Sequence, residues 1–155
     1  MVYKTIISID DLKNNLNNDD FLIFDSRCDI KDSGYGIDSY TEGHIPNSIF
    51  VDVDTDLASE KRPGTGRHPL PDPNTFSEKL SHWGMSNNKQ VVVYDDAGGA
   101  FAGRLWWMLK WLGHEAVAVL DGGLNSWVKG GNKLVTTPTV FEKAHFEPCV
   151  QENMI

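Results

Sequence analysis

The sequence predicts a three-layer α/β protein in which a five-stranded parallel sheet carries helices on both faces. Short apolar runs of strand length recur along the chain, and a helical pattern or a long connection follows each run. The clearest run is Val-Val-Val-Tyr at 91–94, which is typical of a strand buried on both faces of a parallel sheet. Alternation of strands with crossovers of this kind is the pattern of parallel α/β sheets.

The expected elements can be placed along the chain in order. The predicted strands cover residues 5–9, 21–24, 48–53, 91–94 and 117–120. One helix is expected after Ser8 or Asp10, and another after Asn74 or Thr75 with its end at Gly84. Further helices are expected after the last two strands. Two stretches are expected to be irregular, 28–46 and 54–73, and the second is rich in proline.

Length and composition indicate one globular domain. The chain has 155 residues, of which 40% are hydrophobic and 23% charged, so it can bury a sizeable core. The patterning weakens near Asn132. We therefore expect a single domain over residues 1–132, followed by a tail or the start of an interdomain linker over 133–155.

Charge and cysteine content exclude several classes of function. The formal net charge of −8 argues against a nucleic-acid or anionic-membrane partner, because no basic stripe is available. Two cysteines are too few for a disulfide framework, and the histidines lack the spacing of metal ligands. No segment resembles a signal peptide or a membrane span. The sequence predicts a cytoplasmic protein without metal or cofactor.

The candidate site lies where two apolar runs end in polar residues. Asp95 follows the 91–94 strand, and Asp25 and Arg27 follow the 21–24 strand. In open α/β sheets, ligands collect at the carboxyl ends of the strands, where helix N–H groups lack partners. The expected loop consists of Asp95, Asp96, Ala97, Gly98, Gly99 and Ala100.

Several phrases, in the same order along nearly the whole chain, resemble a rhodanese domain. They are Asp25-Ser-Arg27, Tyr40-Thr-Glu-Gly-His-Ile-Pro46, Gly66-Arg-His-Pro-Leu-Pro71, Tyr94-Asp-Asp, Arg104-Leu-Trp-Trp107 and Val119-Leu-Asp-Gly-Gly123. More narrowly, the chain resembles the N-terminal domain of bacterial-type tandem-domain thiosulfate and 3-mercaptopyruvate sulfurtransferases. The resemblance implies the strand order 3-2-4-5-1 and transfer of sulfur from a small anionic donor to a thiophilic acceptor.

One departure from the family pattern decides the expected mechanism. The resemblance implies a catalytic cysteine directly after Tyr94, and this chain has Asp95 there. A carboxylate cannot form a persulfide, so we expect Asp95 to accept hydrogen bonds from the loop N–H groups and to cap the next helix. A phosphatase with a nucleophilic aspartate is disfavoured because such an enzyme has a second carboxylate two residues after the first, and this chain has Ala97 at that position. The chain alone is predicted to be inactive.

The resemblance also implies a partner. A second rhodanese domain would carry the catalytic cysteine, and the present domain would supply one wall of the substrate cleft. The alternative is a stand-alone, inactive rhodanese-like module with a binding or regulatory role. A gene that continues beyond Ile155 into a cysteine-bearing domain would favour the first reading.

Arg67 and His68 stand in the proline-bounded loop and have two interpretations. They are either solvated loop residues, with or without a salt bridge, or residues of the cleft. By resemblance, His68 faces the cleft and could help to bind an anionic donor. Phe101, at the mouth of the Asp95 loop, would line the same cleft.

The remaining candidates have ordinary structural explanations. Arg104, in the first turn of an apolar helix, is expected to form a buried pair with Asp25 or Asp95. Cys28 is expected to be a small buried residue. The polar residues interpreted as structural are Asp25, Arg27, His44 and Arg104.

Overall fold

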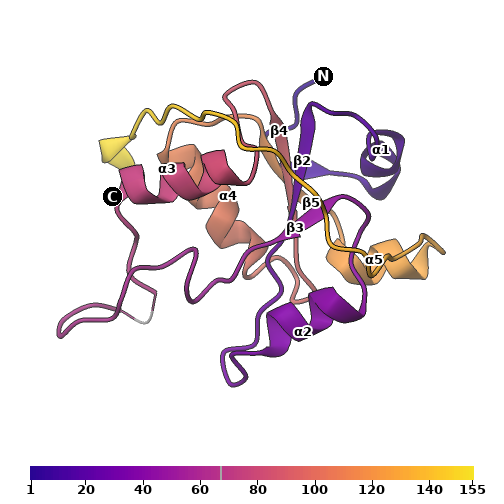
Figure 1. Ribbon diagram of the computed structural model, residues 1–155, viewed down its shortest axis with the longest axis horizontal. Coiled ribbons are helices and arrows are strands. Elements are labelled where there is room, and N and C mark those ends of the chain that lie inside the picture. The colour runs from indigo at the N-terminus through magenta and orange to yellow at the C-terminus, as the bar shows by residue number, and fades with distance from the viewer. Residues whose placement is uncertain (67) are drawn as a thin grey trace.

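The computed structural model describes residues 1–66 and 68–155, and its strands form one parallel sheet (Figure 1). The strands are β1 (Ile6–Ile7), β2 (Phe21–Asp25), β3 (Ser48–Phe50), β4 (Gln90–Tyr94) and β5 (Val117–Leu120). They lie in the order β1-β5-β4-β2-β3, and each neighbouring pair is parallel. Read from the opposite edge, this is the order 3-2-4-5-1, so the predicted fold class is confirmed.

Helices cover both faces of the sheet. They are α1 (Ile9–Asn14), α2 (Tyr35–Glu42), α3 (Pro73–His82), α4 (Ala102–Trp111), α5 (Gly123–Lys129) and the 3₁₀ turn η1 (Glu152–Met154). Helices α3 and α4 share one hydrophobic cluster with the sheet, and α1 and α5 share the other. Within the described residues, no helix combines the length and the apolarity needed to cross a bilayer.

The central strand β4 explains why its sequence is apolar without alternation. Val91 and Val93 pack into the cluster under α3 and α4, whereas Val92 and Tyr94 pack into the cluster under α1 and α5. Side chains alternate along a strand, so a strand covered on both faces needs an apolar residue at every position. Placing β4 centrally brings its carboxyl end between those of β2 and β5.

Helix α2 was not predicted, because its sequence lacks an apolar stripe. Only Gly36 and Tyr40, four residues apart, are buried. A Cβ at Gly36 would lie 2.3 Å from the carbonyl oxygen of Arg27 and 2.9 Å from the Phe50 ring. Close packing of backbone thus replaces the hydrophobic pattern that sequence analysis looks for.

Helix α3 and the two edge strands differ most from their predicted boundaries. Helix α3 begins at Pro73, and Asp72 caps it by accepting a hydrogen bond from the Thr75 N–H, so the predicted cap at Asn74 or Thr75 was wrong. Proline is favoured in the first helical turn, where its missing N–H needs no partner. Strands β1 and β3 lie at the sheet edges and are shorter than predicted.

The chain after α5 runs back across the molecule to the end of α3 (Figure 1). Val135 pairs with His44 in an isolated antiparallel bridge, and Phe146 is 2% exposed. The domain boundary at residue 132 stays a prediction. The segment beyond it is nevertheless packed against the body of the protein.

Candidate functional site

The loop after β4 is built around the carboxylate of Asp95, which is 2% exposed. One carboxylate oxygen accepts hydrogen bonds from the backbone N–H groups of Ala97 and Gly99 at 3.0 and 2.9 Å. The other accepts from Phe101 and Ala102, both at 2.9 Å. These N–H groups form a nest at the start of α4, where an anion is stabilised. The carboxylate fills that nest.

Glycine makes this curl of the loop possible. Gly98 and Gly99 have φ values of 70° and 92°, in the left-handed region that other residues avoid. Beyond them, the Asp95 carbonyl accepts a hydrogen bond from the Leu124 N–H at 2.9 Å, which ties the loop to the start of α5. A depression of about 220 Å³ lies between the Asp95 loop and the start of α5, and its lining includes Asp95, Gly98, Gly99 and Gly123.

Asp96 points away from this nest and has a different partner. The Tyr35 hydroxyl donates a hydrogen bond to its carboxylate, and this bond raises the pKa of Tyr35. Tyr35 opens α2, the helix that sequence analysis missed, so this contact was not foreseen. The contact joins the Asp95 loop to the segment after β2. Ala100, also in the predicted loop, is exposed.

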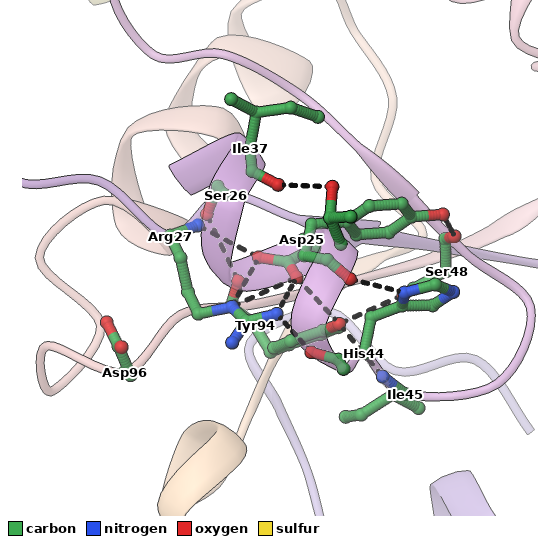
Figure 2. Close-up of polar contacts among 12 residues, drawn as sticks. Asp25, Ser26, Arg27, Ile37, His44, Ile45, Ser48, Tyr94 and Asp96 are labelled. Carbon is green, nitrogen blue, oxygen red and sulfur yellow. Dashed lines mark hydrogen bonds and ion pairs between the residues drawn. The ribbon is translucent and has the colours of Figure 1, made fainter. Parts of the chain in front are cut away.

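Asp25 and Arg27 form a buried ion pair at the end of β2 (Figure 2). Arg27 Nη2 lies 2.7 Å from Asp25 Oδ2, and Arg27 Nε lies 3.1 Å from each carboxylate oxygen. Arg27 Nη2 also donates to the Gly43 carbonyl at 2.7 Å. Figure 2 shows Asp96 apart from this cluster. Hydrogen bonds to both carboxylate oxygens and to the Gly43 carbonyl compensate the burial of the two charges.

Tyr94, the last residue of β4, extends the Asp25 network into the core. Its hydroxyl donates to Asp25 Oδ2 at 3.0 Å, lies 2.9 Å from the Ser48 hydroxyl, and accepts from the Ile45 N–H at 3.1 Å. Burial raises the pKa of Tyr94 well above its usual value, and the Asp25 charge adds to the rise. The network therefore contains a neutral phenol and is closed to solvent.

His44 is buried against the same region and has no access to solvent. Its ring nitrogens lie 2.8 Å from the Tyr40 carbonyl and 2.9 Å from the Thr137 carbonyl. Its ring stacks on that of Tyr40 with centroids 3.7 Å apart. These contacts hold the turn before β3 against the chain after α5, which is a structural role.

Arg104 does not form the predicted pair with Asp25 or Asp95. Its Nη2 donates to the carbonyls of Leu57 and His68, both at 2.8 Å, and its Nε donates to Leu57 at 3.1 Å. Partial burial lowers its pKa. The carboxylates already have other donors, whereas the irregular loop has carbonyls that need them. Arg104 thus anchors the loop at two points.

His68 contacts a carboxylate at the surface. Its Nε2 lies 2.6 Å from Asp54 Oδ1, with the two side chains 17% and 42% exposed. Phe101 is half-buried against the core, and Arg67 lies outside the described residues. A pocket of about 290 Å³ adjoins the His68 pair, and it shares no lining residue with the depression beside Asp95. The rest of its lining is Ile30, Ser59, Glu60 and Lys61.

Cys28, one residue after Arg27, packs against the core but is only half-buried, whereas a buried residue was expected. Burial raises its pKa to about 11, and the carboxylates of Asp54, Asp52 and Asp29 add to the rise. At neutral pH the group is a thiol and not a nucleophilic thiolate.

The sequence profile of the rhodanese-like domain family matches residues 8–130. A probable 3-mercaptopyruvate sulfurtransferase of Pseudomonas aeruginosa is 42% identical over 144 residues, which cover 92% of this chain and 51% of that protein. The thiosulfate sulfurtransferase of Rattus norvegicus is 34% identical over 120 residues, covering 75% of this chain and 39% of that protein. The chain spans about half or less of the length of these relatives.

Solved structures give the same result. The 3-mercaptopyruvate sulfurtransferase from Leishmania major superposes with a TM-score of 0.86 at 30% identity, covering 96% of this chain and 42% of that one. SseA from Escherichia coli superposes with a TM-score of 0.84 at 27% identity, covering 97% of this chain and 59% of that one. The chain therefore belongs to the rhodanese-like domain family, as a homologue of thiosulfate and 3-mercaptopyruvate sulfurtransferases.

Proposed function

We propose that this chain is the non-catalytic, N-terminal half of a two-domain sulfurtransferase. Its sulfur donor would be thiosulfate or 3-mercaptopyruvate, the donors named for its relatives. A second rhodanese domain would carry the catalytic cysteine and face the present domain across a cleft. The coverage of about half of each relative supports this division.

The filled nest around Asp95 is the observation that carries the proposal. Sulfur transfer needs a thiolate that attacks the outer sulfur of the donor, forms a persulfide, and releases the remainder of the donor as the leaving group. In this chain the loop N–H groups that would stabilise such an anion already bind the Asp95 carboxylate. Asp95 has no sulfur to carry, so the loop supports a structural role.

Neither cysteine offers a replacement. The raised pKa of Cys28, about 11, leaves it protonated at neutral pH. Cys149 is exposed on the C-terminal segment, and its backbone N–H bonds the Leu112 carbonyl at the far end of α4 from the Asp95 loop. Both are free thiols, which suits a reducing cytoplasm.

The wall of the cleft would be formed by the irregular loop and the mouth of the Asp95 loop. His68 is held at both ends, its carbonyl by Arg104 and its ring by Asp54. A ring fixed in this way suits a role in orienting an anionic donor. Phe101 completes the proposed wall.

The test is thiocyanate formation from thiosulfate and cyanide, repeated with 3-mercaptopyruvate as donor. We expect background rates for this chain, for Cys28→Ser and for Asp95→Cys, because the second domain's donor-binding groups are absent. Adding the cysteine-bearing domain encoded downstream should restore turnover, and His68→Ala should then lower it. Turnover by this chain alone that is lost in Cys28→Ser would overturn the proposal. A gene without a second domain would favour an inactive binding or regulatory module.

A further inference from the structure

The chain from Ala144 to Gln151, here called the latch, lies beyond residues 8–130 that match the rhodanese family. It crosses the C-terminal ends of α3 and α4 on one side of the molecule (Figure 1). The last carbonyls of a helix have no partner within the helix and need one elsewhere. The latch supplies partners for both helices.

Three backbone hydrogen bonds join the latch to these helix ends. The Ala144 N–H donates to the Ser81 carbonyl of α3 at 2.8 Å. The N–H groups of Cys149 and Gln151 donate to the carbonyls of Leu112 and Trp111 at 2.8 and 2.7 Å. Such bonds depend on backbone alone, so sequence analysis had no pattern from which to predict them.

Side chains also hold the latch in register, and one of them is Ser81, whose hydroxyl oxygen accepts a hydrogen bond from the Phe146 N–H at 2.9 Å. Phe146 is 2% exposed and meets the His114 ring edge-on at a centroid distance of 5.8 Å. The Asn87 side chain bonds both backbone groups of Glu147, accepting from its N–H at 2.9 Å and donating to its carbonyl at 2.8 Å. Phe146 thus holds the latch by apolar packing, and Asn87 holds it by two hydrogen bonds.

Gly113, at the end of α4, fits the closed latch closely. It has a φ of 82°, and a Cβ there would lie 2.6 Å from the Cys149 carbonyl oxygen. A helix-ending glycine satisfies the left-handed turn by itself. Here it also provides the space in which the latch lies.

The segment before the latch is loosely held. Val140 is 93% exposed, and within the described residues no backbone N–H of 140–143 has a hydrogen-bond partner. Segments with few buried contacts open at a lower free energy than the core.

We propose that the latch opens and closes as a unit while the sheet stays folded. Opening frees its eight residues, which span up to about 27 Å when extended. If the proposed function holds, the latch is part of the segment that connects this domain to the second one. That connecting segment is then shorter when the latch is closed and longer when it is open. The opening itself does not depend on sulfur transfer.

The experiment is amide hydrogen exchange measured by mass spectrometry on the whole chain. We expect latch amides in the wild type to exchange faster than the β4 amides of Val92 and Val93. Asn87→Ala removes two hydrogen bonds and should speed latch exchange by about tenfold to thirtyfold without changing β4 exchange. Phe146→Ala should have a larger effect. Val140→Ala, at an exposed position, is the matched control and should change neither.

Two results would overturn the proposal that the latch opens as a unit. One is exchange of latch amides at the β4 rate in the wild type and in Asn87→Ala, since the latch would then unfold only with the core. The other is unchanged latch exchange in Asn87→Ala. Both readouts are independent of enzymatic turnover, so a failed activity assay would leave this result intact.

Discussion

Asp25 and Asp95 are buried carboxylates at the carboxyl ends of two neighbouring strands. Asp25 is the last residue of β2 and Asp95 follows β4, yet different groups stabilise them. Asp25 is paired with the Arg27 guanidinium and the Tyr94 hydroxyl. Asp95 has no cationic partner among the described residues and accepts four backbone N–H bonds instead. Both are almost completely buried, at 0% and 2% exposure.

The difference separates a carboxylate that maintains the fold from one that occupies a site. Removing Asp25 leaves a buried guanidinium without its counter-charge, and no nearby solvent can replace it. Removing Asp95 leaves a ring of N–H groups beside the depression of about 220 Å³ that Asp95 lines, from which water or an anion can enter. The first position should therefore govern stability, and the second should govern anion binding.

The largest effect is expected for Asp25→Ala. Breaking a buried ion pair on one side typically costs about 3–5 kcal/mol, so unfolding should shift to a much lower urea concentration. The double variant Asp25→Ala with Arg27→Met, which removes both charges, should recover part of that loss. An equal or larger loss in the double variant would contradict an uncompensated Arg27 charge as the cause.

A smaller loss, about 2 kcal/mol, is expected for Asp95→Ala, because its N–H donors can turn to water. Sulfate should then bind the vacated nest and raise the Tm of Asp95→Ala but not that of the wild type. Thermal unfolding with sulfate and with chloride at equal ionic strength measures the difference. A similar sulfate response in both proteins would mean that Asp95 does not fill an anion site.

Alkaline pH should destabilise the protein in part through the Asp25 network. Burial holds the pKa of Tyr94 well above its usual value of 10.0, so the unfolded chain loses this proton first and stability falls as pH rises above 10. Tyr94→Phe should lose about 1 kcal/mol at pH 8 through its missing hydrogen bonds, and should show a shallower decline between pH 9 and pH 11. Parallel declines in the two proteins would exclude Tyr94 as the titrating group.

The smallest effect concerns the thiol beside the Asp25 network. With a pKa of about 11, Cys28 should be alkylated by iodoacetamide at pH 8 far more slowly than the exposed Cys149. Peptide mass spectrometry gives the two rates separately, and Cys149→Ser identifies the Cys28 signal. Rapid labelling of Cys28 would remove the chemical argument against it as a sulfur carrier.

Sequence analysis succeeded where side-chain chemistry repeats along the chain. The apolar run of β4 and the polar residues after it identified the sheet and the Asp95 loop, because burial on both faces requires such a run. Sequence analysis failed where close backbone packing determines the local structure. Helix α2 depends on the closeness of Gly36 to the Arg27 carbonyl, and no periodic pattern records such a contact.

The partners of the charged residues also lay beyond prediction. Asp25 and Arg27 lie at the carboxyl end of β2 and Arg104 lies in the first turn of α4, as predicted. Which acceptor each cation meets depends on distances of a few ångströms between separate elements. A carboxylate partner was predicted for Arg104, but Arg104 donates to the backbone carbonyls of Leu57 and His68.

By itself, the sequence determined the parallel sheet, its strand order through the family resemblance, and the presence of a carboxylate where the family pattern has cysteine. These depend on residue identity and on spacing along the chain. Only the tertiary structure decided which groups neutralise Asp25, which carbonyls Arg104 bonds, and that residues 144–151 close over two helix ends. The reason is physical: backbone N–H and carbonyl groups occur at nearly every residue, so only their positions in space select the partners.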